Sequence, residues 1–258
     1  IVHIVGTMGM GGAQQQVLNL IKSPALSEYR HSIVCAIAKQ GEFLQPAVDA
    51  GIAVYECPVR WSPPYLLPSY RLNRFLRNRL QFTFSRRLAR LLRTIDANLV
   101  HSQLTAFMYW QANAVLRKAN LPWVWTLQGL YKTRGEDITQ WAPALKLIAA
   151  SDIAAVTGVS SAALDEVAQY QVVAPEKLHV IYNGVETTRF VSSPELRNLW
   201  RKRWNIPEEA FVFGSAGRLI PVKRFDVALS AFVEIARERS DVHFALAGDG
   251  ELSGALKT

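Results

Sequence analysis

The sequence predicts an α/β fold with a mostly parallel sheet. Short apolar runs suited to buried strands alternate with amphipathic segments of helical period, and this alternation is typical of βαβ units. The alternation is interrupted once, by the polar stretch 191–208, and then begins again, so we expect two domains. Half of the 258 residues are hydrophobic and 19% are charged, which is the composition of a globular rather than a disordered chain.

The first domain is expected over residues 1–190. Short apolar runs predict its strands, which are Ile1–Val5, Ser32–Ala38, Ile52–Cys57, Asn98–His101, Trp123–Leu127, Ile153–Thr157 and Leu178–Tyr182. Apolar residues at helical spacing predict its helices, which are Ala13–Lys22, Phe43–Ala50, Tyr70–Ile95, Thr105–Ala119, Ala142–Ala150 and Ser160–Tyr170. Gly51 is placed to end the second of these helices, and Ser160 or Ser161 to cap the last.

Residues 191–208 are expected to be a linker with a short helix at Pro194–Trp204, since the stretch is polar and proline-containing. A second domain is expected to begin at residue 209, with strands Phe211–Phe213 and His243–Ala247 and the helix Phe225–Arg239. Two strands and one helix are too few for an independent core. We therefore interpret residues 209–258 as the start of an incomplete domain.

A glycine-rich loop, Gly6–Gly12, joins the first strand to the first helix. Gly11 and Gly12 stand where the helix begins, so the backbone there can approach a phosphate closely. The spacing differs from G-x-G-x-x-G, and the second strand ends at Lys39 rather than at an acid, so a dinucleotide site is disfavoured. The alternative is a tight turn that needs small residues.

Two cations lie between a strand and a helix in the second domain. Arg218 and Lys223 flank the proline of the loop 215–223. Amide groups at a helix start favour anions, arginine adds a planar fork and lysine adds a point charge. The pattern is suited to holding a diphosphate, and the alternative is a loop whose charges are only solvated.

Ligands of parallel α/β sheets bind at the carboxyl ends of the strands. The candidate cleft residues outside the glycine-rich loop follow these ends, and they are His101, Gln128, Gly129, Ser160, Asn183 and Gly184. No metal site is expected, because no two of the five histidines stand at helical spacing from each other. No Walker loop and no G-x-S-x-G elbow occurs.

Charge and cysteine content bear on partners and location. The net charge of +8 indicates an anionic partner, but no nucleic-acid-binding module is recognisable, so nucleic acid is not expected. Cys35 and Cys57 are the only cysteines and form no disulfide framework, which favours a reducing, cytoplasmic location. No apolar run approaches the roughly 18 residues of a membrane-spanning helix.

The segment from Arg60 to Arg93 has nine arginines and no acidic residue. Basic amphipathic helices with aromatic residues can lie on an anionic membrane surface. The alternative is a helix that covers the sheet and keeps a solvated basic face.

The sequence resembles retaining glycosyltransferases of glycosyltransferase family 4, the group 1 glycosyltransferases. The matching pieces follow the family's order and cover nearly the whole chain; they are GGAQQQVLNL, LVHSQ, WVWTLQG, VTGVSSAALDEV, VIYNGVETTRF, GSAGRLIPVKRFDVALSAF and FALAGDGEL. VIYNGVETTRF and GRLIPVK are the more specific of them.

The resemblance implies the GT-B architecture, in which two Rossmann-like domains face a cleft. It implies transfer of a sugar from a UDP- or GDP-linked donor to a sugar or lipid-linked acceptor, with retention and without a metal ion or cofactor. Cell-envelope polysaccharide or glycolipid synthesis at the inner face of the membrane would be the setting. Gly11 and Gly12 would lie by the donor, and Arg218 and Lys223 would hold its diphosphate and stabilise the leaving group. No residue is identified as catalytic.

The sequence departs from the family pattern in three places. Gln128 stands where histidine is usual, and glutamine cannot take a proton near neutral pH. Val222 and Arg224 stand where glutamate and glycine are common, which could alter the phosphate loop. The family's two glutamates, eight residues apart, would lie beyond Thr258, so residues 1–258 alone are expected to be inactive.

Two other classes stay open from the sequence. A sugar-nucleotide epimerase of GT-B shape would act without an acceptor. A non-catalytic binding or membrane-attachment module would account for Gln128 and for the missing glutamates.

Overall fold

The structure, a computed structural model, describes residues 1–58, 84–103, 120–130, 153–171 and 173–256. The chain divides into two compact units, residues 1–185 and 186–258. The first unit thus ends five residues before the expected domain end at residue 190, and the second includes the stretch expected to be a linker.

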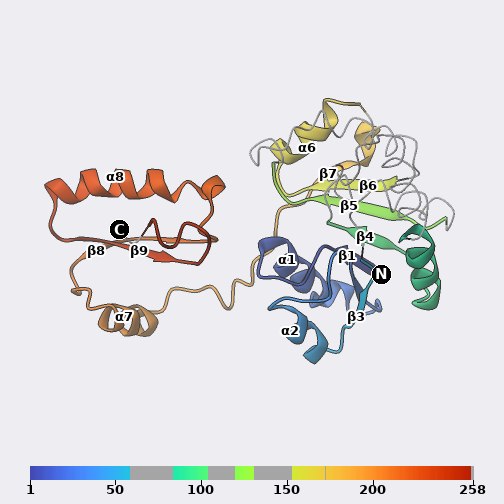
Figure 1. Cartoon of the computed structure of the whole chain (residues 1–258), viewed down its shortest axis with the longest axis horizontal. Helices are drawn as coiled ribbons and strands as arrows, with labels where there is room; N and C mark the ends of the chain where they lie inside the picture. The colour runs from blue at the N-terminus through green and yellow to red at the C-terminus, as the bar shows by residue number, and fades with distance from the viewer. Residues whose placement is uncertain (59–83, 104–119, 131–152, 172, 257–258) are drawn as a thin grey trace, which may run out of the picture. The chain divides into compact units, whose positions relative to one another are not determined.

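Unit 1 is built on a seven-stranded sheet in the order β3-β2-β1-β4-β5-β6-β7, in which every neighbouring pair is parallel (Figure 1). The strands are β1 (Val2–Val5), β2 (Ser32–Cys35), β3 (Ala53–Glu56), β4 (Val100–Ser102), β5 (Trp123–Leu127), β6 (Ile153–Gly158) and β7 (Leu178–Val180). All seven predicted strands are present, and each observed strand overlaps its expected range.

In the described part of unit 1 the helices include α1 (Gly12–Ile21), α2 (Leu44–Asp49) and α6 (Ser161–Ala168), and short 3-10 turns lie at Pro24–Leu26 and Pro175–Lys177. Residues 84–94, part of the long predicted helix, are also helical. Gly51 follows α2 with φ 74°, and the Ser160 hydroxyl oxygen caps α6 by accepting from the Ala163 amide at 3.2 Å. The expected helices at Thr105–Ala119 and Ala142–Ala150 lie outside the described residues.

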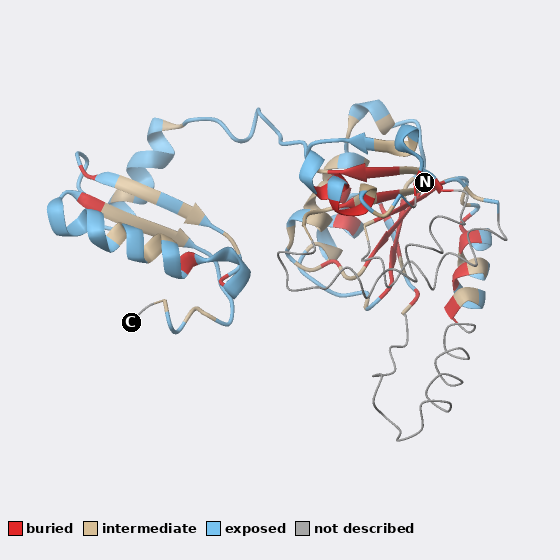
Figure 2. Cartoon of the chain, turned by 90° about the horizontal axis from the view of Figure 1, so that it is seen from above, coloured by how far each residue is buried: buried red, intermediate tan, exposed pale blue. Residues whose placement is uncertain are grey.

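The sheet is covered on both faces, as a parallel sheet requires. One core cluster contains Trp123 and Trp125 with Leu88 and Leu92 of the helical segment 84–94. The other contains Ile33 with Val17 and Leu18 of α1. Figure 2 shows the buried residues concentrated in the strands of unit 1.

The strand order has one topological switch, between β1 and β4. The chain winds outward to β3 on one side of this point and to β7 on the other. Ligands of such sheets bind in the crevice outside the carboxyl ends of the strands at the switch. The glycine-rich loop follows β1, and Gln103 follows β4, so both lie at this point.

Unit 2 contains α7 (Pro194–Arg203), the parallel strand pair β8 (Phe211–Ala216) and β9 (Val242–Ala247), the 3-10 turn Pro221–Lys223 and α8 (Phe225–Glu238). The helix α7 begins at Pro194 because Ser193 caps it: the Ser193 hydroxyl accepts from the Leu196 amide at 3.1 Å. Most of the unit is exposed or half-buried (Figure 2).

The second strand ends earlier than predicted because the chain after Cys35 turns to bind the glycine-rich loop. The Met8 amide donates to the Gln40 carbonyl, and the Phe43 amide donates to the Met8 carbonyl, both at 2.8 Å. Between these bonds Gly41 has φ 123°, and a Cβ built there would lie 2.3 Å from the Gly9 nitrogen. Gly41 is therefore a glycine that both conformation and packing require.

We expect Gly41→Ala to destabilise unit 1 more than Gly51→Ala does. At Gly51, which has φ 74° and open space around it, alanine meets only the left-handed backbone cost of about 1–2 kcal/mol. At Gly41 the added methyl also collides with the glycine-rich loop. Hydrogen exchange of the Met8 and Phe43 amides should rise more in Gly41→Ala than in Gly51→Ala, and equal exchange in the two variants would contradict this account.

Candidate functional site

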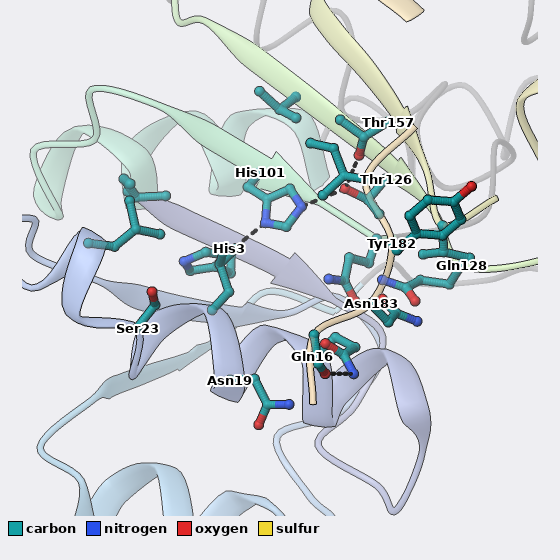
Figure 3. Close-up of a pocket in the computed structure, with 18 of the residues that line it drawn as sticks. His3, Gln16, Asn19, Ser23, His101, Thr126, Gln128, Thr157, Tyr182 and Asn183 are labelled. Atoms are coloured by element: carbon teal, nitrogen blue, oxygen red, sulfur yellow. Dashed lines mark hydrogen bonds between the residues drawn. The ribbon is translucent and has the colours of Figure 1, made fainter. Parts of the chain in front are cut away.

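A pocket of about 420 Å³ lies within unit 1, on the sheet face that α1 partly covers (Figure 3). The side chains that line it come from α1, from β1, β4, β5 and β6, and from the segment 181–184. It reaches the carboxyl ends of the central strands at Gln128 and Val159.

The floor of the pocket is a row of polar side chains on one sheet face. Because side chains alternate along a strand, His3 points away from the face of Val2 and Ile4, which belong to the tryptophan-containing cluster. The pairing of β1 with β4 brings His3 beside His101. The pairing of β5 with β6 likewise brings Thr126 beside Thr157.

Hydrogen bonds join these four side chains one after another, from His3 to Thr157 (Figure 3). The His3 Nδ1 lies 2.9 Å from the His101 Nδ1. The His101 Nε2 lies 2.8 Å from the Thr126 Oγ1, which lies 2.7 Å from the Thr157 Oγ1. Both ring nitrogens of His101 therefore have partners inside the protein.

Burial keeps the two imidazoles uncharged. It lowers the pKa of His101 to about 4, because a charged ring would lose its hydration. The pKa of His3 lies well below its usual value, chiefly through burial and then through its neighbours His101, His31 and the amine of Ile1. The floor is thus polar but neutral.

Amide and apolar side chains line the rest of the pocket. Gln16 of α1 donates to the Gly184 carbonyl at 3.0 Å, which fixes the segment 181–184 to unit 1. Gln128 and Asn183 lie close by at the carboxyl end of the sheet (Figure 3). The side-chain oxygen of Gln103 is buried and has no hydrogen-bond partner among the described residues. That oxygen is an acceptor still open to a donor.

The structure brings four of the predicted cleft residues together at this pocket: His101, Gln128, Asn183 and Gly184. Gly129 follows Gln128 with φ 153° and does not line the pocket. Ser160 does not line it either, and its hydroxyl serves as the cap of α6.

Gly11 and Gly12 lie at the start of α1. Gly11 is the N-cap, with an extended backbone at φ −166°, and Gly12 is the first helical residue. A Cβ built on Gly12 would meet no atom within 4 Å. The packing around it therefore does not require glycine, and the space over this helix start is open.

A carboxylate fixes the loop that leads to this helix start. The Glu42 Oε2 accepts from the Met10 amide at 2.7 Å. Its own backbone amide and that of Met10 hold the pKa of the Glu42 carboxyl below its usual value. Sequence reasoning did not single out Glu42, since only the fold brings it to the loop.

Arg218 and Lys223 belong to unit 2, where both are exposed between β8 and α8. Neither forms an ion pair with any of the residues that the structure describes. Arg224, by contrast, pairs with Asp226 at 3.2 Å and has φ 51° and ψ 40°. It thus takes a left-handed conformation that glycine adopts more easily, and its charge is neutralised locally.

Sequence reasoning missed His3 and His31, because each of them is an isolated histidine in the sequence. The His31 ring stacks on that of His3 with centroids 5.2 Å apart. The signal that could have found them is strand register, because His3 and His101 become neighbours only once β1 is paired with β4.

Metal binding, membrane crossing and the arginine-rich segment were also considered in the sequence. In the described ranges of the chain, no three His, Cys, Asp or Glu side chains form a group that could hold a metal ion. Of the helices that the structure describes, none has the length and apolarity to cross a membrane. The arginine-rich segment lies mostly outside the described residues; of its nine arginines only Arg86, Arg87, Arg90 and Arg93 fall within them.

We expect unit 1 to lose stability in acid because of His101. An unfolded histidine gains a proton as pH falls through about 6.5, whereas folded His101 does so only near pH 4. Stability is therefore full above pH 6.5 and falls by about 3 kcal/mol between the two values. Hydrogen exchange of the β1 and β4 amides against pH measures the slope, which should be shallower in His101→Gln. The slope should be unchanged in His179→Gln, a control at an exposed site in β7.

Comparison with known proteins identifies the family. The sequence profile described as Glycosyltransferase Family 4 matches residues 10–189, and the profile described as Glycosyl transferases group 1 matches residues 197–258. A search of curated proteins finds no match.

Solved structures share the fold. Anabaena Alr3699/HepE in complex with UDP-glucose has a TM-score of 0.73 and 19% identity, over 99% of this chain and 62% of that one. An E. coli structure described as trehalose-6-phosphate bound with UDP-2-fluoro glucose has a TM-score of 0.62 and 10% identity, over 97% and 65%. A protein assigned as a UDP-N-acetylglucosamine 2-epimerase, from Listeria monocytogenes, has a TM-score of 0.51 and 13% identity, over 99% and 64%.

At these identities the structural likeness concerns the fold alone, and the chain spans about 62% of the length of HepE. The profile of the first unit, in contrast, matches well over half of the sequence. The protein therefore belongs to glycosyltransferase family 4, and its fold is that of the GT-B glycosyltransferases.

Proposed function

We propose that the whole protein transfers a sugar from a nucleotide-diphosphate donor to an acceptor hydroxyl, with retention of anomeric configuration, in glycan or glycolipid synthesis. The observation that carries the proposal is the pair Arg218 and Lys223. Both cations are exposed beside the start of a 14-residue helix, and no described carboxylate neutralises them. An unpaired arginine and lysine at a helix start suit a diphosphate.

The residues that we assign to the donor are Arg218 and Lys223 of unit 2 and Gly11 and Gly12 of unit 1. The open space over Gly12 lets the donor approach the first amides of α1. As charge develops on the departing diphosphate, Arg218 and Lys223 stabilise it electrostatically. HepE binds UDP and UDP-glucose in its crystal structures, which supports a UDP-linked donor here; a GDP-linked sugar is the alternative.

The acceptor side is the pocket of unit 1. Its amide and hydroxyl side chains can hydrogen-bond the hydroxyl groups of a sugar or of a lipid-linked sugar. Gln128, Asn183 and the Gly184 backbone lie at the carboxyl end of the sheet, and His101 lies deeper. Gln128 orients a ligand here but takes no proton, so we assign no catalytic base to this chain.

The setting proposed is the cytoplasm, at the inner face of the membrane, where the arginine-rich segment 60–93 would meet anionic lipid. No cofactor and no metal ion is proposed for the transfer. We further propose that residues 1–258 bind ligands but do not complete transfer, because we identify no side chains for the sugar and ribose of the donor among the described residues.

We expect Lys223→Ala and Arg218→Ala each to reduce turnover of the whole enzyme about ten- to a hundredfold. A charge-assisted hydrogen bond to phosphate is worth on the order of 1.5–3 kcal/mol. Lys202→Ala is the matched control, since Lys202 is an exposed lysine of the same unit on α7. The assay measures nucleotide released from UDP-sugars with and without an acceptor extract. Unchanged turnover in both test variants would remove the diphosphate assignment. Conversion of the UDP-sugar into an isomer, without acceptor and without release of nucleotide, would favour an epimerase.

We expect Gly12→Ala to separate function from folding. The methyl group enters open space at the first turn of α1, where alanine is the better helix former, so stability should be kept or slightly raised. A donor held against this turn would be displaced, and misplacement of about 1 Å can lower the rate by up to about a hundredfold. Unfolding and turnover are measured on the same preparation. Full activity in the stable variant would place the donor away from α1.

A further inference from the structure

The hydrogen-bonded row on the pocket floor continues beyond the pocket, to a backbone carbonyl. The His3 Nε2 lies 3.0 Å from the His31 Nδ1. The His31 Nε2 lies 3.1 Å from the Leu26 carbonyl oxygen. Five successive hydrogen bonds therefore run from Thr157 to Leu26 through three imidazole rings. We name this series the histidine chain.

The histidine chain has one direction when its rings are neutral. The Leu26 carbonyl can only accept, so the His31 Nε2 must donate, and the other nitrogen of a neutral ring must accept. The His3 Nε2 then donates to His31, which leaves the His3 Nδ1 as an acceptor. The His101 Nδ1 consequently donates to His3, and the His101 Nε2 accepts from Thr126.

The threonine end of the chain inherits this direction. The Thr126 hydroxyl hydrogen is committed to His101, so the bond between the two threonines must use the Thr157 hydrogen. Both hydroxyl hydrogens are then used inside the protein. What remains for a ligand at this part of the pocket is oxygen lone pairs, and a hydroxyl oxygen has two of them.

The rest of the lining agrees with this polarity. The buried Gln103 side-chain oxygen, also on the pocket wall, has no donor among the described residues. Among the lining residues that the structure describes, none has a charged side chain. The amine of Ile1 donates to the Arg30 carbonyl at 2.7 Å.

We propose that Thr126 and Thr157 are specificity-determining residues of the pocket, and that His101 is the positioning residue that sets their hydrogen-bond polarity. The ligand of the pocket is uncharged and donates a hydroxyl hydrogen to the two threonines. The proposal rests on the proposed function, because it names the class of the acceptor: a neutral glycoside. An anionic group is rejected at the floor, since its oxygens would face lone pairs without a hydrogen between them.

The first test measures the tautomers directly. Nitrogen-15 NMR of the histidine-labelled chain near neutral pH should show His3 and His31 protonated at Nε2 and His101 protonated at Nδ1, with none of the three charged. A packing role alone does not fix this pattern of protons. His101 protonated at Nε2, or a charge on any of the three rings, would overturn the proposal, because the Thr157 hydrogen would then be free to point at the ligand.

The second test measures ligand class with matched probes. Methyl glucoside and methyl galactoside should shift the NMR signals of Thr126 and Thr157, whereas the corresponding methyl uronides, which differ by one carboxylate, should not. Thr157→Val should weaken glycoside binding about two- to tenfold, the effect of one neutral hydrogen bond, and Thr157→Ser should restore it. The comparison of glycosides with uronides on the wild-type protein tests the proposal even if Thr157→Val does not fold.

The outcomes separate this inference from the proposed function. Equal shifts with glycosides and uronides, or no shift with either, would overturn the inference while leaving the turnover effect of Lys223→Ala as it is. Glycoside binding at Thr157 together with unchanged turnover in Lys223→Ala and Arg218→Ala would support the ligand class inferred for the pocket. It would also contradict the assignment of these two cations to the diphosphate.

Discussion

The parallel pairing of β1 with β4 is the interaction on which the site of unit 1 depends. In this register His3 lies beside His101, and Val2 lies beside Val100. A shift by one residue would turn each histidine into the apolar core and each valine towards the pocket. The same pairing forms the switch point of the sheet, so a single set of backbone hydrogen bonds positions both the pocket floor and the glycine-rich loop. Burial of the apolar residues on one face of the sheet specifies the register. The same register brings the polar side chains of the opposite face together.

One face of the central strands therefore packs in the hydrophobic core, and the other face lines the pocket. Trp123, Trp125 and Leu127 pack into the larger core, where their burial stabilises the unit. Thr126, between them in sequence, points to the opposite face and joins the histidine chain. Buried polar groups are costly unless each has a partner, and the chain from Thr157 to the Leu26 carbonyl provides one for every ring nitrogen in it. Full pairing explains how three imidazole rings can lie together on one face of the sheet.

Charge is distributed unequally between the pocket and the loop of unit 2. The pocket of unit 1 has amides, hydroxyls and neutral imidazoles, whereas the loop between β8 and α8 has exposed cations. This division suits a reaction that joins an uncharged acceptor to a sugar leaving a diphosphate. Arg224 takes a left-handed backbone conformation, which glycine adopts more easily, and Asp226 neutralises its charge. Arg224 therefore adds no free cation to the loop.

The sequence by itself determined the local elements, because the period of apolar residues and the caps are local properties. Trp123–Leu127 has the predicted strand bounds, and Ser160 caps α6 as expected. It also placed Gln128, Asn183 and Gly184 at strand ends, which parallel topology gathers at one edge. Only the tertiary structure decided the strand order, the register that joins His3 to His101, and the approach of Glu42 and Gly41 to the glycine-rich loop. These contacts join residues that are far apart in the chain, and their geometry follows from which strands pair and in what register.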